Sequence, residues 1–278
     1  MQSSFDIEEF LVNALSEDVG EGDITSNATI GRDVKAAFAF NAREKLVVAG
    51  LVHLPMIFAL LNSTMKVKLL VADGDLVAAG TSLATVEGPA RALLAAERTA
   101  LNLLQQLSGV ATLTRAYVDA VAGTNAKIFD TRKTIPGLRD LQKYAVRCGG
   151  GNNHRMGLYD AVLIKDNHIA VAGGVAAAVK AARSQVKPDI AIQVECDTLE
   201  QLSEALEAKV NSVLLDNMDN ATLKECAARC KAAGVISEAS GNVNLQTVRA
   251  IAETGVDRIS VGKLTHSAVA VDIGLDEV

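Results

Sequence analysis

The feature that most constrains this chain is a regular alternation of short apolar runs with helical segments from about residue 113 onward. Six runs are short and apolar enough to be buried strands, and they cover residues 127–129, 161–164, 190–194, 212–215, 235–237 and 258–261. Between these runs, the spacing of apolar residues is that of a helix at residues 174–183, 199–208 and 221–233. Repeated strand–helix units of this length predict a parallel β/α architecture, either a barrel or a doubly wound sheet.

Polar residues or glycines follow the successive apolar runs, where the strands are expected to end: Asp130, Lys165, Glu195, Asp216, Ser240 and Gly262. From Lys165 onward they recur at intervals of 30, 21, 24 and 22 residues, about one strand–helix unit each. In a barrel, the carboxyl ends of all strands open into one mouth, whereas a doubly wound sheet concentrates its site near one switch point. Six contributing strand ends therefore favour a barrel.

The first part of the chain, to about residue 112, has a different pattern, which predicts an α+β domain. The expected elements are a helix at 5–15, a turn at 23–25, strands at 35–40 and 66–71, and a helix at 90–108 that opens after Pro89. Arg98 lies off the apolar stripe of that long helix, so its spacing alone predicts a solvated residue. The segment 71–88 resembles the hairpin of biotinyl and lipoyl carriers, but it contains no lysine to modify, which favours a structural β-rich domain.

The composition is that of a globular protein, with 49% hydrophobic and 22% charged residues. A net charge of −6 and only 3% aromatic residues argue against nucleic-acid binding. There is no apolar run long enough to span a membrane, and residues 1–10 carry acidic groups where a signal peptide needs basic ones, so we expect a cytoplasmic protein. None of the four cysteines forms a C-x-x-C pair, and the one-turn spacing of Cys226 and Cys230 indicates reduced thiols on a packed helix face.

Basic residues are concentrated between Lys127 and Lys165, where eight Lys or Arg and three Asp or Glu leave a local balance of +5. Arg132 offers a planar fork for carboxylate or phosphate oxygens, Lys133 a point charge, and His154 with Arg155 two further donors. The glycines at 149–151 permit close backbone approach, although they do not match a P-loop. Together these residues predict a cradle for a small ligand with several negative groups.

The later strand ends leave several chemistries open. Lys165 fits a strand-end charge, an anion ligand, or the Schiff-base nucleophile of a barrel aldolase, which needs a neutral amine that neighbouring cations would favour. Glu195 and Asp216 fit acid–base catalysis, ribose binding, Mg²⁺ binding or simple helix capping. The small residues at 240–242 and 260–262 expose backbone N–H groups, as late barrel loops that bind phosphate do. Carboxylates that could bind ribose or Mg²⁺, together with loops that could bind phosphate, indicate a phosphosugar substrate.

Several motifs occur in order over nearly the whole chain: EGDITS, ERTALNLLQQLSGVAT, DTRKTIPGLR, KYAVRCGGGNNHRMGLYDAVLIKDNHI, VECDTLEQL, LLDNM, EASGN and ISVGKLTHSA. They resemble the motifs of the quinolinate phosphoribosyltransferase family. The resemblance implies an α/β fold with an N-terminal α/β sandwich domain at residues 1–112, on which the tail 272–278 packs back. It also implies an incomplete α/β barrel of parallel strands at 113–271, and a homodimer, or a higher oligomer built from it, with shared active sites.

The resemblance also assigns roles to individual positions. Matching positions around quinolinate and the leaving pyrophosphate are Thr131, Arg132, Lys133, His154, Arg155 and Lys165, with Arg98 contributed by the partner subunit. Those around the phosphoribosyl group and its phosphate are Glu195, Asp216, Ser240, Gly241, Asn242, Ser260, Gly262 and His266. The catalytic set is Lys133, Lys165, Glu195 and Asp216, and the last two would hold Mg²⁺ directly or through water. Lys263 departs from the small residue expected beside the phosphate loop.

The implied reaction joins quinolinate to the phosphoribosyl group of phosphoribosyl pyrophosphate and releases pyrophosphate and CO2, in NAD biosynthesis. It would need Mg²⁺, no organic cofactor, and no nucleic-acid or membrane partner. Three alternatives remain at this point. They are a related phosphoribosyltransferase, either nicotinate-specific or the paralogue associated with molybdate transport, a Schiff-base aldolase that uses Lys165, and a non-catalytic carrier.

Overall fold

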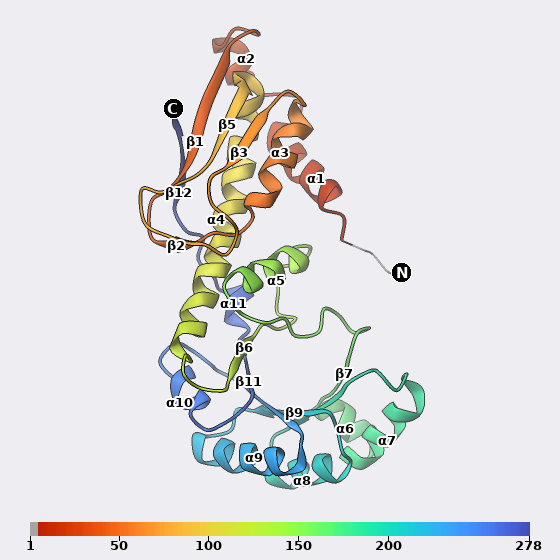
Figure 1. Cartoon of the computed structure of the whole chain (residues 1–278). Helices are drawn as coiled ribbons and strands as arrows, with labels where there is room; N and C mark the ends of the chain where they lie inside the picture. Colours follow the sequence, from red (N-terminus) through yellow and green to blue (C-terminus); the bar gives the residue numbers. More distant parts are fainter. Residues whose placement is uncertain (1–4) are drawn as a thin grey trace. The chain divides into compact units, whose positions relative to one another are not determined.

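The computed structural model describes residues 5–278. Residues 1–4, which begin the expected first domain and the segment considered as a signal peptide, lie outside the described part. The chain forms two compact units (Figure 1). The first contains the N-terminal part to Leu113 together with Asp140–Gly150 and Ala268–Val278, and the second contains Thr114–Arg139 and Gly151–Ser267. The long helix α4 (Ala90–Ala120) begins in the first unit and ends in the second, since the boundary in the sequence lies between Leu113 and Thr114.

The first unit is built on a four-stranded antiparallel sheet in the order β12-β1-β5-β3. Its strands are β1 (Lys35–Ala42), β3 (Lys66–Leu69), β5 (Ser82–Pro89) and β12 (Ile273–Glu277). A small second sheet pairs β2 (Leu46–Val47) with β4 (Leu76–Val77). Because β5 pairs with β1 on one side and β3 on the other, the segment that resembles a carrier hairpin supplies a central strand of this sheet.

The first unit also contains helices before, between and after its strands, and two expectations about this part of the chain were wrong. They are α1 (Ile7–Val19), α2 (Ile24–Thr29), the 3-10 turn η1 (Leu51–His53), α3 (Leu54–Leu61), α4 and α5 (Arg139–Cys148). The turn expected at 23–25 is the start of α2, because the Asp23 carboxylate accepts the Ser26 N–H at 3.0 Å as an N-cap. Helix α4 begins directly after Pro89, as expected, but it continues past the expected end at 108 to Ala120.

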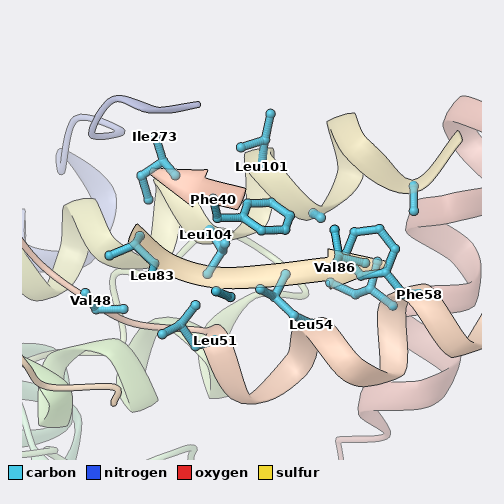
Figure 2. Packing of buried hydrophobic residues seen from close by; sticks show 14 of the residues in the cluster. Phe40, Val48, Leu51, Leu54, Phe58, Leu83, Val86, Leu101, Leu104 and Ile273 are labelled. Carbon is cyan, nitrogen blue, oxygen red and sulfur yellow. The ribbon is translucent and has the colours of Figure 1, made fainter. Parts of the chain in front are cut away.

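The core of the first unit is a single apolar cluster drawn from α1, α3, α4 and the sheet (Figure 2). Phe40 of β1 and Phe58 of α3 are both fully buried, and their rings meet edge to face with centroids 6.1 Å apart. Leu104 of α4 and Ile273 of β12 join the same cluster. The C-terminal strand is therefore held both by its pairing with β1 and by apolar burial.

The second unit is a six-stranded sheet in which every pairing is parallel. Its strands are β6 (Lys127–Phe129), β7 (Val162–Ile164), β8 (Ile192–Cys196), β9 (Ser212–Asp216), β10 (Ile236–Ser240) and β11 (Arg258–Ser260). The order is β6-β11-β10-β9-β8-β7, which runs through the chain without reversing and brings the first strand beside the last. This is barrel order, and because β6 and β7 remain at the two edges, the barrel is incomplete, as expected.

Helices α6 (Asp166–Ala172), α7 (Val175–Gln185), α8 (Leu199–Glu207), α9 (Asn220–Ala233), α10 (Val248–Ala252) and α11 (Lys263–His266) connect or follow these strands. The three helices predicted from spacing are confirmed as α7, α8 and α9. Local signals set their ends: Asp219 caps α9 by accepting the Thr222 N–H at 2.8 Å, and Gly234 ends it in the left-handed conformation. Within residues 5–278, no helix is long and apolar enough to cross a membrane.

Three of the four thiols are buried in the second unit, on β8 and on the inner face of α9. Cys196, Cys226 and Cys230 are fully buried, and Cys148 of the first unit is half-buried. Burial raises the pKa of the Cys196 and Cys230 thiols to about 12, and it also raises the pKa of Cys226. Burial therefore disfavours the reactive thiolate at all three positions in the folded protein.

We expect a thiol-specific disulfide reagent at pH 8 to label only Cys148 in the native protein, and slowly, since burial raises the pKa of this thiol as well. Guanidinium should expose all four thiols. The measurement is the number of thiols that react before and after unfolding. A Cys148→Ser variant is the control, and rapid labelling of its native form would contradict the burial described here.

Candidate functional site

A cavity of about 600 Å³ is lined by residues that belong to, or directly follow, all six parallel strands of the second unit. This volume suits a small-molecule ligand. All the site residues expected in this unit line it: Thr131, Arg132, Lys133, His154, Arg155, Lys165, Glu195, Asp216, Ser240, Gly241, Asn242, Ser260, Gly262 and His266. Arg98, the residue expected from a partner subunit, lies on α4 in the first unit and is not among the lining residues.

The pleat of the strands explains which side chains meet in the cavity. Successive side chains of a strand point to opposite faces, so the residue two positions before a strand-end group faces the same way. Leu163 precedes Lys165 in this way, and Leu214 precedes Asp216; both leucines line the cavity. They give it an apolar surface to which Val243 and Val261 contribute. Sequence reasoning missed Leu163, Leu214 and Val243, although the two-residue period would have indicated the leucines; Val261 lies in the segment 260–262 that it expected at the site.

Arg132 and Arg155 form the basic part of the cavity. The Nε of Arg132 is buried and has no hydrogen-bond partner in the described part of the chain. Arg155 donates one Nη1 hydrogen bond to the Ala161 carbonyl at 3.1 Å. Burial first, and then the positive charge of Arg132, lower the pKa of Arg155 from its usual value. Two neighbouring guanidinium groups, one of which has an unsatisfied Nε–H donor, are suited to bind an anionic ligand.

Side chains outside the cavity hold the two loops that carry these cations. The buried Asp130 carboxylate accepts the His154 backbone N–H at 2.8 Å and the Asn153 side-chain amide at 2.5 Å. Arg139 donates to Thr134 Oγ1 at 3.0 Å and to the Met156 carbonyl at 2.9 Å. The loop after β6 is therefore joined to the loop before β7.

The glycines at 149–151 do not line the cavity, so their expected place in the ligand cradle was wrong. Gly149 and Gly150 instead end helix α5: their N–H groups donate to the Ala145 and Arg147 carbonyls at 3.0 and 2.9 Å. Gly150 has φ +86°, the left-handed backbone typical of a residue that follows a helix.

His154 is held by protein groups at both ring nitrogens. Nδ1 accepts the Arg155 backbone N–H at 2.8 Å, so the ring proton lies on Nε2. Nε2 lies 3.1 Å from Gln193 Oε1 and 3.4 Å from Glu238 Oε1. The histidine therefore helps to orient the backbone of Arg155 as well as lining the cavity.

Glu238 is the centre of a buried polar network that sequence reasoning also missed. Its carboxylate is fully buried and accepts hydrogen bonds from Gln193 Nε2 at 2.9 Å and from Ser260 Oγ. With His154, these donors satisfy a buried charge that would otherwise be costly. Gln193 and Glu238 lie two residues before Glu195 and Ser240, so the period of the strands was again the available signal.

Two carboxylates form the acidic part of the cavity. Lys165 Nζ donates to Glu195 Oε2 at 2.7 Å, and Asp216 Oδ2 accepts from Asn217 Nδ2 at 2.6 Å. Asp216 is also paired in register with Ser240 of β10. Mg²⁺ is commonly held by one or two carboxylates together with substrate phosphates and water, and this pair fits that requirement.

Backbone-rich segments after β10 and β11 complete the cavity. Gly241 has φ +93°, and a Cβ there would collide with the Asn217 side chain, so only glycine fits. A Cβ on Gly262 would lie 3.0 Å from Lys133 Cδ and 3.2 Å from His266 Nε2. Such segments let the backbone approach a ligand closely. Lys263, the departure noted in the sequence, lines the cavity beside them.

Comparison with known proteins identifies the family. Residues 23–108 match the quinolinate phosphoribosyl transferase N-terminal domain, and residues 110–276 match the corresponding C-terminal domain. The chain belongs to the quinolinate phosphoribosyltransferase family.

Its relatives match over nearly their full lengths. A nicotinate-nucleotide pyrophosphorylase [carboxylating] of Mycobacterium leprae is 46% identical over 270 residues, which is 95% of this chain and 94% of the relative. A probable enzyme of the same name from Bacillus subtilis is 44% identical over 260 residues, covering 94% and 89%. The crystal structure of nicotinate-nucleotide pyrophosphorylase from Ehrlichia chaffeensis is similar with a TM-score of 0.93, at 43% identity and 100% coverage of both chains. The predicted fold class is confirmed.

We expect Glu238→Gln to lower the free energy of unfolding by roughly 1–3 kcal/mol, because the new amide group places a donor among donors in a buried network. Urea denaturation followed by circular dichroism measures this change. Glu225→Gln on α9 is the matched control, since Glu225 forms an exposed pair with Arg229 at 3.7 Å, which contributes little. Equal stability of the two variants would contradict the role given to the network.

Proposed function

We propose that this chain transfers the phosphoribosyl group of phosphoribosyl pyrophosphate to quinolinate, with decarboxylation, in NAD biosynthesis. The products are nicotinate mononucleotide, pyrophosphate and CO2. The observation that carries the proposal is the meeting of two arginines, three lysines and two carboxylates with glycine-containing segments in one cavity. Membership of the family supports the reaction class.

Quinolinate carries two carboxylates on adjacent ring carbons, and the basic part of the cavity offers matching donors. The forks of Arg132 and Arg155 suit carboxylate oxygens, and Thr131 and Lys165 line the same cavity. Leu163 and Leu214 provide an apolar surface for the pyridine ring. His154 Nε2 already faces Gln193 and Glu238, so its contribution is to hold Arg155 and shape this part of the site.

The phosphoribosyl half would occupy the other strand ends. The segments Ser240–Gly241–Asn242 and Ser260–Gly262, with His266, offer small residues and polar groups to the 5′-phosphate. Glu195 and Asp216 would bind ribose hydroxyls and hold Mg²⁺, directly or through water. A bound Mg²⁺ would supply charge neutralisation for the pyrophosphate, and Lys133 and Lys165 would add positive charge in the same cavity. Lys263 supplies a further cation at the cavity wall.

The chemistry needs positioning and charge neutralisation rather than a protein nucleophile. The ring nitrogen of quinolinate forms a bond to ribose C1 as the C1–O bond to pyrophosphate breaks, and the nitrogen becomes positively charged. The bond to the adjacent carboxylate then breaks, CO2 leaves, its electron pair stays on the ring carbon, and a proton replaces it. No organic cofactor is required. A site rich in Arg and Lys suits these steps.

The alternatives fit the site less well. Lys165 lies 2.7 Å from the Glu195 carboxylate, a partner for an ammonium ion rather than for a Schiff-base amine. The segment that resembles a carrier hairpin is a central sheet strand. Nicotinate has a single carboxylate and would leave one of the two arginines without a match. The cytoplasmic location remains a prediction.

The decisive assay supplies phosphoribosyl pyrophosphate and Mg²⁺ with either quinolinate or nicotinate, and follows pyrophosphate and CO2. We expect turnover with quinolinate and loss of it when a chelator removes the metal. Arg132→Ala and Arg155→Ala should each raise the KM for quinolinate about 10- to 100-fold, the value of a charged hydrogen bond. Arg115→Ala, an exposed residue paired with Asp119, is the control. Turnover of nicotinate alone would overturn the proposal.

The proposal includes a homodimer in which Arg98 of one subunit completes the site of the other. A direct test is complementation between Arg98→Ala and Arg132→Ala, assayed at a low quinolinate concentration at which neither variant alone shows appreciable activity. In a mixed dimer of C2 symmetry, one site has both arginines and the other has neither, and half of randomly paired dimers are mixed. Activity should therefore recover to about a quarter of wild type when the variants are co-expressed in equal amounts. No recovery, with mixed dimers present by mass spectrometry, would show that Arg98 does not act across subunits.

A further inference from the structure

Asn217, which follows β9, has contacts on two sides of the cavity although it does not line the cavity itself. Its backbone is left-handed, with φ +52°, a conformation that asparagine tolerates better than most residues. Its N–H donates to the Ser240 carbonyl at 3.0 Å, which ties the end of β9 to the end of β10. The position therefore joins the acidic part of the cavity to the loop expected to bind phosphate.

The side-chain amide of Asn217 uses both of its ends. Nδ2 donates to Asp216 Oδ2 at 2.6 Å, and Oδ1 accepts from Asn242 Nδ2 at 3.1 Å. The reverse orientation would turn the amide oxygen toward an acceptor-only carboxylate, so the orientation is determined by Asp216. One amide group thus fixes a carboxylate oxygen and a loop side chain at the same time.

Gly241 provides a second, steric connection. Its φ is +93°, and a Cβ there would lie 2.8 Å from the Asn217 backbone nitrogen as well as against the side-chain oxygen. Asn242, the next residue, is also left-handed, with φ +49°. The loop after β10 therefore takes its shape against Asn217, by direct packing and by one hydrogen bond.

We propose that Asn217 is a positioning residue that sets the distance and orientation between the Asp216 carboxylate and the Gly241–Asn242 loop. In the proposed function, Asp216 contacts the ribose or its Mg²⁺ and the loop contacts the 5′-phosphate, so Asn217 would align the two parts of one sugar phosphate. The inference rests on that function for the identity of the ligand. Its geometry concerns only the phosphoribosyl half, so the quinolinate half should be unaffected by changes at Asn217.

The test uses Asn217→Gly, which keeps a backbone suited to positive φ and removes both side-chain hydrogen bonds. Calorimetry measures binding of ribose 5-phosphate with Mg²⁺, and separately of quinolinate, and steady-state kinetics gives the KM for phosphoribosyl pyrophosphate. We expect a loss of about tenfold or more in sugar-phosphate affinity, the usual effect of removing a group that orients a ligand-binding side chain. Quinolinate affinity should stay within about twofold of wild type, a change below the scale of one lost hydrogen bond.

Two further variants separate positioning from simple turn stability. Asn217→Asp keeps the size, the tolerance of the left-handed backbone and the acceptor for Asn242, but it faces Asp216 with a second carboxylate; it should be impaired at least as much as Asn217→Gly. Lys209→Gly, at another left-handed position, with φ +53° at the end of α8, is the matched control and should leave all three quantities unchanged.

Each outcome is decisive. Wild-type sugar-phosphate affinity in Asn217→Gly or Asn217→Asp, or an equal fall in quinolinate affinity, would overturn the inference. Failure of wild-type protein to bind ribose 5-phosphate would also overturn it. If wild type binds ribose 5-phosphate and Asn217→Gly weakens that binding, but quinolinate is not turned over, then the proposed function fails while the role of Asn217 stands.

Discussion

The pleat of the parallel strands is the constraint on which the candidate site depends. Side chains alternate along each strand, so those that face the barrel interior form layers. The outer layer contains Lys165, Glu195, Asp216 and Ser240, and the layer beneath it contains leucines and the network around Glu238. The outer layer, which is expected to contact the ligand, and the layer that supports it are therefore adjacent in space, although many of their residues are far apart in the sequence.

Electrostatics explains why the buried acids are as informative as the exposed cations. Several positive side chains share one cavity, and each is costly to hold there without an opposing charge. The buried carboxylates of Asp130 and Glu238 lie against the backbone or ring of His154, which supports the neighbouring Arg155. The two acids add negative charge close to the cations of the cavity, and the buried Nε of Arg132 remains without a partner in the described part of the chain.

The sequence predicted the barrel and the polar strand-end residues of the cavity because both depend on one repeated signal, an apolar strand followed by a polar end. It did not predict α5, because its sequence is mostly polar and the following glycines are typical of ligand loops as well as of helix ends. Asp23 was assigned to a turn because the same side chain serves turns and N-caps. The two-residue period of the strands could have placed Glu238 on the cavity face, but its role, like that of Asn217, depends on partners 45 and 25 residues away, Gln193 and Asn242. Only the fold brings these pairs together.

The open edge of the barrel has a consequence for how such a site can change over time. Strand β6 is not paired with β7, and Asn152 instead forms a parallel bridge with Phe129 of β6. The loop from Gly151 to Ala161, rather than a ladder of strand hydrogen bonds, therefore connects the part of the site that holds Arg132 to the part that holds Lys165. Insertions or replacements in one loop can alter the span between these cations without shifting the register of any strand. In an incomplete barrel, the shape of the ligand site can therefore change during evolution while the sheet keeps its stability.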